Sequence, residues 1–394
     1  MLSSPLLFIA GQISYTNKDG ECLLVVAFCL FKYFPYGGLQ RDFYRIANEV
    51  ASRGHSVRVY TRQWEGRQPE NFEVILVPTH SLSNAGKNTQ YYQWVRAHLD
   101  QHPVDKVVGF NRMPGLDVYF AADVCYAESH KNDSVFYKLT PRYRQFIAYE
   151  KSVFAKGLKT KILLLTQNSQ TVFQQHYQTE SDRFFLLPPG IDRSRRYDRQ
   201  PPDSRRKFRE KFNLSLKQKL ILQVCSNYEL KGVDRTIHAL ASLPKEVKDE
   251  TFLFIVGEDD SKKLASLAQK LGVQNHVRFF SGRDDIPQFM LGADILLHPA
   301  RKEAAGIVIL EAIVSCLPII VSGLCGYCHY VNQANAGIVL PEPFKQELYN
   351  QVLYETLQNE IQLKQWGQNA KRFTDHYDLY SLANRAADII LDEE

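Results

Sequence analysis

The sequence predicts an α/β protein built from two doubly wound, Rossmann-like halves. Three observations support this fold class. The 394 residues exceed what one ordinary hydrophobic core requires. Short continuous apolar runs, which are typical of buried parallel strands, alternate with segments in which apolar residues recur at helical spacing. This alternation stops once, in a Pro- and Arg-rich stretch from 188 to 202, and then starts again.

The first half begins with the apolar run 23–30, followed by a glycine-containing loop and a helical pattern from about Leu39 to Gly54. Strand, glycine turn, helix and strand in this order are typical of the start of a parallel sheet. The later elements of this half are expected as strands at 57–61, 74–77, 106–110, 162–166 and 185–187, and as helices at 91–99 and 170–176.

The second half repeats this rhythm. Its elements are expected as strands at 220–224, 251–256, 277–280, 295–297 and 319–321, and as helices at 233–243, 262–271, 287–291 and 307–315. A last helix, 380–391, is expected to cross back onto the first half. Ligands are expected at the carboxyl ends of the strands, in a cleft that the two halves face. The expected domains are therefore 23–190 together with about 376–394, and 191–375.

Residues 1–22 are expected to form an N-terminal tail. They contain one short apolar patch, 6–10, without a basic leader or a small-residue cleavage site, which argues against a signal peptide. No window of the chain approaches the ~18–20 uninterrupted apolar residues of a membrane-spanning helix. Seven cysteines, an odd number without a leader, favour reduced thiols in the cytoplasm.

Positive charge is concentrated in two segments of a chain whose net charge is +5. Residues 126–161 hold eight Lys or Arg against three acidic residues, and residues 193–211 hold nine against three. Charge localised in this way favours anionic partners for these surfaces.

The segment EAAGIVILE contains the strongest candidate site, with Glu303 and Glu311 eight residues apart. The small residues between them precede an apolar helix. They allow a ligand to approach the N–H groups at the helix N-terminus, where phosphate is favoured. Glu303 is suited to accept hydrogen bonds from sugar hydroxyls, and Glu311, one turn into the helix, from ribose hydroxyls. The same two positions also suit a helix-dipole partner and a solvated helix residue.

Two turns have the composition of phosphate-binding loops. Tyr36-Gly37-Gly38 directly follows the first strand, where glycine permits positive φ and close backbone approach. Lys231-Gly232 stands at the corresponding place in the second half, where a lysine is placed to meet a diphosphate. Each turn also fits an ordinary strand–helix connection with an exposed basic residue.

Acidic candidates in the first half are Asp42, near the first turn of its first helix, and Asp117 and Asp123, which are expected on the cleft side. Capping and turn chemistry is the alternative explanation for all three.

The chain contains no D-x-D triplet, so the usual carboxylate arrangement for a metal-bridged nucleotide-sugar is missing. The charge on a leaving diphosphate is then expected to be met by basic side chains and helix N-termini. Arg195 and Arg283 are candidates for this role beside Lys231.

The segment 136–161 interleaves aromatic with basic residues and predicts an amphipathic surface suited to an anionic membrane. A domain helix that buries its aromatic residues and exposes its lysines is the alternative. The basic residues predicted for membrane contact are Lys138, Arg142, Arg144, Lys151, Lys156 and Lys159.

Together these segments resemble the retaining family 4 glycosyltransferases, which have the GT-B fold. E-x7-E with a small-residue centre, Lys-Gly at the opening of the second half and Gly-Gly after the first strand carry the resemblance. It is closer still to the glucosyltransferases of the lipopolysaccharide inner core, through YFPYGGLQRD (33–42), FNRMPGLDVYFAADVCYAE (110–128), KGVDR (231–235) and CGYCHY (325–330).

The resemblance implies roles for individual residues. Those implied to bind the donor are Gly37, Gly38, Arg195, Lys231, Arg283, Glu303, Ala304, Ala305, Gly306, Ile307 and Glu311. Those implied to be catalytic or to face the acceptor are Asp123, Asp42 and Glu303. One feature departs from the family pattern, because 225–230 lacks the second basic residue that usually precedes the Lys-Gly lysine. Arg195 or Arg283 is expected to compensate.

The activity that the resemblance implies is transfer of glucose from UDP-glucose to the first heptose of the lipopolysaccharide inner core. Configuration would be retained, and neither a metal nor another cofactor is expected. The enzyme would be peripheral on the cytoplasmic face of the inner membrane. Two alternatives stay open: a related enzyme with another donor or a lipid-linked glycan acceptor, and a non-catalytic nucleotide-sugar-binding protein. No recognition motif for nucleic acid is present.

Overall fold

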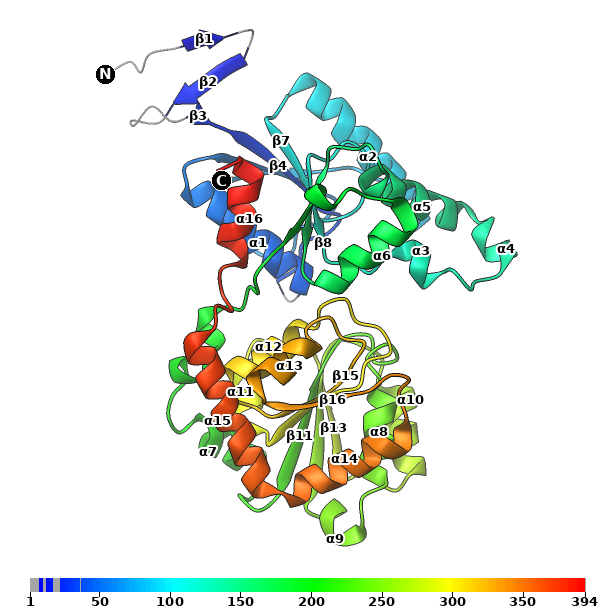
Figure 1. Ribbon diagram of the computed structural model, residues 1–394, viewed down its shortest axis with the longest axis vertical. Helices are drawn as coiled ribbons and strands as arrows, with labels where there is room; N and C mark the ends of the chain where they lie inside the picture. The colour runs from blue at the N-terminus through cyan, green and yellow to red at the C-terminus, as the bar shows by residue number, and fades with distance from the viewer. Residues whose placement is uncertain (1–6, 10–11, 17–21, 36, 394) are drawn as a thin grey trace. The chain divides into compact units, whose positions relative to one another are not determined.

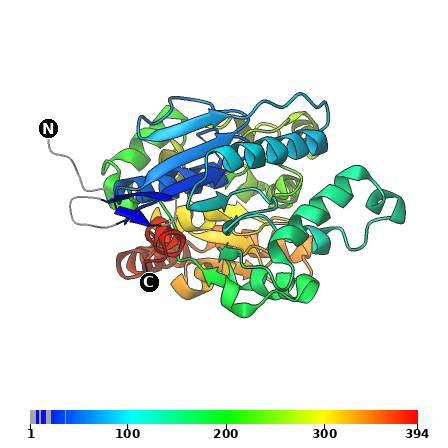
Figure 2. The ribbon, with the colours of Figure 1, turned by 90° about the horizontal axis from the view of Figure 1, so that it is seen from above.

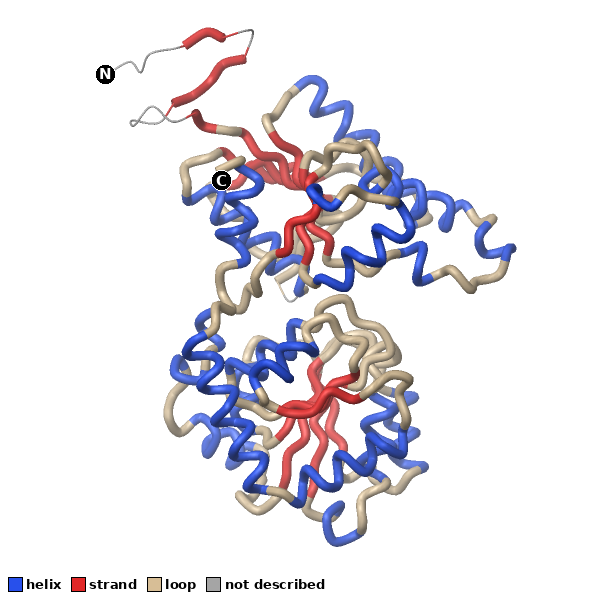
Figure 3. Tube along the Cα trace, viewed as in Figure 1, coloured by secondary structure: helices blue, strands red, loops and turns tan. Residues whose placement is uncertain are grey.

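The computed structural model describes residues 7–9, 12–16, 22–35 and 37–393. The chain forms two compact units, of which unit 1 comprises the chain up to Pro188 and again from Ser381, and unit 2 comprises Pro189–Tyr380. The expected boundaries, 190 and about 376, differ from these by a few residues. Each unit contains a parallel sheet covered by helices (Figure 3), and each is described by itself below.

Unit 1 contains a seven-stranded parallel sheet in the order β10-β9-β8-β7-β4-β5-β6. Its strands are β4 (Val25–Cys29), β5 (Ser56–Thr61), β6 (Phe72–Leu76), β7 (Lys106–Gly109), β8 (Val118–Ala121), β9 (Lys161–Leu164) and β10 (Phe184–Leu186). Its helices are α1 (Gly38–Ser52), α2 (Asn84–Gln101), α3 (Tyr126–Ser129), α4 (Val135–Lys138), α5 (Pro141–Phe154), α6 (Gln167–Tyr177) and α16 (Leu382–Leu391).

Successive residues of β4 pack on opposite faces of this sheet, as the pleat requires. Val26 and Phe28 belong to a core that includes the apolar faces of α1 and α16. Ala27 and Cys29 belong to the opposite core, which includes residues of α2, α5 and α6. Because both faces are covered, the strand is apolar throughout, and this continuous pattern made β4 predictable.

The last helix, α16, belongs to unit 1 and lies beside α1 (Figure 1). Beyond its apolar contacts, charged groups hold its end in place. Arg53 Nη1 lies 2.7 Å from a carboxylate oxygen of Asp388. Lys106 and Lys161 each place an ammonium nitrogen 2.5 Å from an oxygen of Asp392.

Unit 2 contains a six-stranded parallel sheet in the order β13-β12-β11-β14-β15-β16. Its strands are β11 (Lys219–Val224), β12 (Thr251–Val256), β13 (Val277–Phe280), β14 (Ile295–His298), β15 (Ile319–Ser322) and β16 (Gly337–Leu340). Its helices are α7 (Ser204–Lys211), α8 (Val233–Ala241), α9 (Lys245–Lys248), α10 (Lys262–Lys270), α11 (Ile286–Gly292), α12 (Ile307–Val314), α13 (Cys328–Ala334), α14 (Gln346–Gln358) and α15 (Glu360–His376).

In both parallel sheets the strand order reverses beside the strand that comes first in the sequence of that sheet. The reversal lies between β4 and β7 in unit 1 and between β11 and β14 in unit 2. Connections leave these neighbouring strands toward opposite faces, which opens a crevice at their carboxyl ends where open α/β sheets bind ligands. The loops that follow these four strands are therefore the candidate binding loops.

Several elements were not predicted. Residues of the expected tail form a small antiparallel sheet, in which β1 (Leu7–Ile9) pairs with β2 (Gln12–Thr16) and β2 pairs with β3 (Cys22–Leu23). The strand β8 has only four residues, and all are buried, so its sequence lacks the alternation of apolar and polar residues that marks a strand. The predicted alternation of strands and helices stopped at 319–321, so α13, β16, α14 and α15 were not predicted either.

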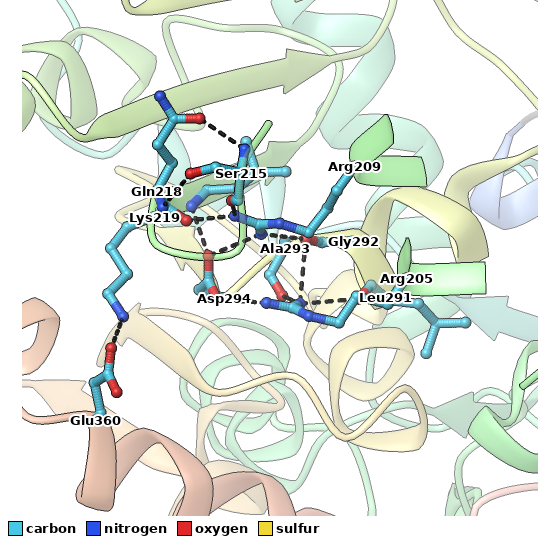
Figure 4. Close-up of polar contacts among 11 residues, drawn as sticks. Arg205, Arg209, Ser215, Gln218, Lys219, Leu291, Gly292, Ala293, Asp294 and Glu360 are labelled. Carbon is cyan, nitrogen blue, oxygen red and sulfur yellow. Dashed lines mark hydrogen bonds and ion pairs between the residues drawn. The ribbon is translucent and has the colours of Figure 1, made fainter. Parts of the chain in front are cut away.

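Part of the basic segment 193–211 is engaged within unit 2, but five of its nine basic residues are exposed, so its interpretation as a surface for anionic partners stays a prediction. Arg205 and Arg209 of α7 donate to main-chain carbonyls at the end of α11 and to the carboxylate of Asp294 (Figure 4). Asp294 also accepts a hydrogen bond from the N–H of Leu220 at 2.7 Å. Arg209 is 1% exposed, so its charge balances a carboxylate and helix-end carbonyls and is not available to a ligand.

Candidate functional site

The two loops at the reversal point of unit 2 meet at Gly232. This residue caps the N-terminus of α8 with φ of 65°. A Cβ atom here would lie 2.3 Å from the carbonyl oxygen of Pro299, in the loop after β14. Both the left-handed conformation and the close approach favour glycine. The predicted Lys-Gly turn therefore brings Lys231 to the loop that carries Glu303.

Lys231 and Glu303, separated by 71 intervening residues, form an ion pair in this crevice. The Nζ atom of Lys231 lies 2.6 Å from Oε2 of Glu303, and the same oxygen lies 3.2 Å from Nε2 of His298. Burial opposes ionisation of Glu303, but the hydrogen bond from His298 and the charge of Lys231 outweigh it. The pKa of Glu303 is lowered to about 2. The carboxylate is thus a fixed negative acceptor at neutral pH.

The sequence did not predict His298, the last residue of β14. Its side chain is almost fully buried, and within the described residues its Nδ1 atom is buried without a hydrogen-bond partner. A proton on Nδ1 would be buried and unpaired, so the tautomer with hydrogen on Nε2, donating to Glu303, fits best. The sequence did contain a signal for His298, because it is a polar residue at the end of a buried strand, five positions before Glu303.

The helix α12 begins after Gly306, which has φ of 87°, so the predicted small-residue turn does adopt a conformation that favours glycine. Glu311 in this helix is 5% exposed, which excludes its interpretation as a solvated residue. Arg195 Nη1 lies 3.1 Å from Oε1 of Glu311. The structure thus joins two predicted donor residues that are far apart in sequence.

The segment after β15 packs directly against the small-residue turn. The N–H of Tyr327 donates to the carbonyl oxygen of Ala305 at 2.7 Å. Ser322, the last residue of β15, adds a contact just before this turn, because its hydroxyl donates to the carbonyl oxygen of Ala300 at 2.9 Å. Burial raises the pKa of the Cys325 thiol to about 12, so this thiol is protonated at neutral pH. CGYCHY therefore supports the backbone of the Glu303 loop.

Arg283 is not brought together with Lys231 and Glu303 by any contact among the described residues. It follows β13, the edge strand of the sheet, and its guanidinium forms an ion pair with Asp285 and lies 4.7 Å from the centre of the Phe289 ring. This pairing raises the pKa of Arg283. Its predicted place beside a nucleotide stays a prediction.

In unit 1, Gly37 and Gly38 start α1 at the reversal point, as expected. Tyr36 lies outside the described residues. Gly37 has φ of −77°, so it does not use the positive φ that glycine permits. Nothing lies within 4 Å of where a Cβ atom of Gly38 would stand, which leaves its backbone open to a ligand. Asp42, in the second turn of α1, lies 4.0 Å from Arg45.

The two later carboxylates of unit 1 lie at opposite edges of the sheet. The side chain of Asp117 accepts from the N–H of Val107, near the start of β7, so it lies at the amino edge and not on the cleft side as expected. Asp123 follows the carboxyl end of β8 and is exposed. Of this predicted pair, only Asp123 lies at the edge where ligands bind.

The basic segment 136–161 is divided by the structure. Phe154 is fully buried in the core, and Tyr143 and Phe146 pack on Tyr126, as in the alternative interpretation. Around α4, however, the apolar side chains point to solvent. Exposed fractions there are 71% for Val135, 85% for Phe136 and 54% for Leu139. The helices α3 and α4 extend outward from the sheet of unit 1 (Figures 1 and 2).

Comparison with known proteins identifies this architecture. The model of "Glycosyltransferase Family 4" matches residues 36–195, and the model of "Glycosyl transferases group 1" matches residues 204–373. The lipopolysaccharide glucosyltransferase WaaG of Escherichia coli K12 is 54% identical over 93% of this chain and 98% of the relative.

Solved structures agree with this result. The crystal structure of WaaG, a glycosyltransferase involved in lipopolysaccharide biosynthesis, matches with a TM-score of 0.90 over 93% of this chain and 99% of that one. Anabaena HepE in complex with UDP-glucose has the same fold at 18% identity, with a TM-score of 0.73, over 94% of this chain and all of that chain. Both units therefore form a GT-B glycosyltransferase fold.

Proposed function

The chain belongs to the family 4 glycosyltransferases, and we propose that it transfers glucose from UDP-glucose to the first heptose of the lipopolysaccharide inner core. The observation that carries this proposal is the Lys231–Glu303–His298 cluster at the reversal point of unit 2. It occurs in a chain 54% identical to a lipopolysaccharide glucosyltransferase. In this proposal Glu303 binds hydroxyls of the transferred glucose, Glu311 binds the ribose, and Lys231 neutralises the diphosphate.

The proposed transfer retains configuration and needs no metal. Glu303 is already engaged by Lys231 and His298, which suits a residue that orients hydroxyls better than a nucleophile that attacks the anomeric carbon. We propose that the diphosphate itself takes the acceptor proton on the front face of the sugar, while Asp123 and Asp42 orient the acceptor. Lys231, Arg195, Gly38 and the N-terminus of α12 would hold the diphosphate charge.

The decisive measurement is transfer to heptose-terminated lipopolysaccharide from a panel of UDP-sugars, with and without EDTA. We expect UDP-glucose to be preferred and the rate to be unchanged by EDTA, because Lys and backbone N–H groups replace a metal. The linkage of the product should be α. Preference for another donor, or loss of the rate in EDTA that Mg²⁺ restores, would contradict the proposal.

We further propose that unit 1 docks on the inner face of the inner membrane through α4 and its surroundings. Among the described residues no helix combines the length and apolar character needed to span a bilayer. Phe136 and Leu139 would insert at the interface, and the basic residues near them, Lys138, Arg142 and Arg144, would face anionic headgroups. Lys151, Lys156 and Lys159, beyond them in sequence, would add to this attraction.

Replacing Phe136 by serine is expected to weaken binding to vesicles with anionic lipid by about 10- to 100-fold. This factor corresponds to the free energy of about 1.5–3 kcal/mol that burial of one large apolar side chain contributes. Replacing Lys151, Lys156 and Lys159 by glutamine should weaken binding further at low salt. Cosedimentation with vesicles measures both. Leu82→Ser is the matched control, because Leu82 is a fully exposed leucine elsewhere on unit 1. Equal binding of all variants would rule out this surface.

A further inference from the structure

A buried ion pair in unit 1 lies directly behind the loop that carries Asp123. Arg112, after β7, and Glu150, in α5, are joined by a distance of 2.6 Å between Nη1 and Oε2. The side chains are 9% and 0% exposed, respectively. A pair so deeply buried is costly unless its remaining polar atoms are satisfied, so the other contacts of the two residues show what the pair does.

Apart from the Nε of Arg112, which is buried without a hydrogen-bond partner among the described residues, the polar groups left by the ion pair are directed at the backbone around Cys125. Arg112 Nη2 donates to the carbonyl oxygens of Asp123, at 3.2 Å, and Val124, at 2.8 Å. Glu150 accepts from the N–H of Tyr126 at 2.7 Å and from the N–H of Ala127 at 3.0 Å. One ion pair thus binds the carbonyls before Cys125 and the N–H groups after it.

Two side chains complete the surroundings of Glu150. The hydroxyl of Tyr177, in α6, donates to Oε1 at 2.6 Å, and the Cys125 thiol lies 3.4 Å from the same oxygen. Burial and the neighbouring carboxylate raise the pKa of both groups, to about 12 for Cys125, so both remain protonated donors. Phe154 and Phe173 lie beside the guanidinium of Arg112, with ring centres 5.9 and 5.8 Å away.

We propose that the Arg112–Glu150 pair positions the 122–127 loop, defined as the loop after β8 together with the first two residues of α3, and thereby presents Asp123 to the acceptor. This inference rests on the proposed function. Neither residue of the pair would touch substrate, so both are positioning residues. Asp123 itself is exposed and its main-chain carbonyl is held by Arg112, so the pair fixes the backbone from which the Asp123 side chain projects. The pair also ties α5, next to the proposed membrane surface, to the acceptor side of the site.

The test is Glu150→Gln in the full-length chain, compared with Glu180→Gln. The control removes another unit 1 carboxylate that accepts a backbone N–H, from Gly157, and pairs with Arg183, but lies away from the 122–127 loop. We expect Glu150→Gln to lower kcat by about 10- to 100-fold, the effect of a small misplacement of a reacting group. Binding of UDP and the KM for UDP-glucose should stay at wild-type values. The control should leave kcat within about twofold.

A second variant, Arg112→Lys, covers the case in which Glu150→Gln does not fold. Lysine keeps the charge beside Glu150 but lacks the second nitrogen that binds the carbonyls of Asp123 and Val124. It should therefore lower kcat while UDP binding persists. Unchanged kcat in a folded variant of either residue would overturn the proposal, as would a parallel loss of UDP binding.

Hydrogen exchange separates this inference from the proposed function. In Glu150→Gln, a peptide covering 122–127 should exchange faster than in the wild type, whatever the substrate is, because the N–H groups of Tyr126 and Ala127 lose a charged acceptor. If the wild type transfers no glucose but the variant exchanges faster, the proposed function is refuted and the positioning of this loop is still supported. Unaltered exchange would refute the positioning role itself.

Discussion

Replacing Glu303 by alanine is expected to lower kcat/KM for glucose transfer by about 10²- to 10³-fold, as the loss of one preorganised polar group does in other enzymes. The carboxylate is held in place by Lys231 and His298, at 2.6 and 3.2 Å. Alanine would remove the proposed acceptor for the glucose hydroxyls and would leave Lys231 without this partner. Steady-state kinetics with UDP-glucose and heptose-terminated lipopolysaccharide measure the effect.

Glu347→Ala is a matched control, because Glu347 is an exposed carboxylate in the first turn of another unit 2 helix, α14. It should leave kcat/KM unchanged. Turnover that survives Glu303→Ala would show that the donor site lies elsewhere or that the chain acts in another way. Lowering the pH within the ordinary assay range should not reproduce the loss of activity that Glu303→Ala causes. The lowered pKa of Glu303 keeps it ionised until the pH falls toward about 2. Its contribution to stability is lost only between its ordinary pKa and that value.

Replacing Asp294 by alanine is expected to lower the free energy of unfolding of unit 2 by about 3–5 kcal/mol, the cost of removing one partner of a buried ion pair. Asp294 lies 2.6 Å from Arg205 Nη2 and 3.3 Å from Arg209 Nη1. Without it the almost fully buried Arg209 would keep its charge and lose its only carboxylate among the described residues. The N–H of Leu220 would lose its acceptor as well.

Hydrogen exchange of peptides from β11 and β14 in rising urea measures this loss within unit 2. Asp203→Ala is the control, because Asp203 precedes the same helix, α7, and pairs with Arg206 and Lys207 on the surface. Surface pairs contribute at most about 1 kcal/mol. Equal urea midpoints for the two variants would mean that the network in Figure 4 contributes little to stability.

Much of the candidate site could be predicted from the sequence, because its residues follow strands of parallel sheets. Lys231, Gly232, Gly306 and Glu303 all lie in loops at the carboxyl ends of β11 and β14, and their local sequence marks strand, turn and helix start. The elements that were missed show why other parts of the fold could not be predicted from the sequence. The strand β8 is four residues long and buried on both faces, so no local period distinguishes it from a loop.

The sequence by itself determined the α/β rhythm, the division near residue 188, and the small residues and charges that stand at the ends of strands. These depend on local spacing, which a single chain displays directly. Only the tertiary structure decided which charges meet. It pairs Lys231 with Glu303 and Arg195 with Glu311, but directs Arg209 into the fold and places Asp117 at the opposite edge of its sheet. Such contacts depend on strand order, which joins residues far apart in sequence and leaves no local pattern.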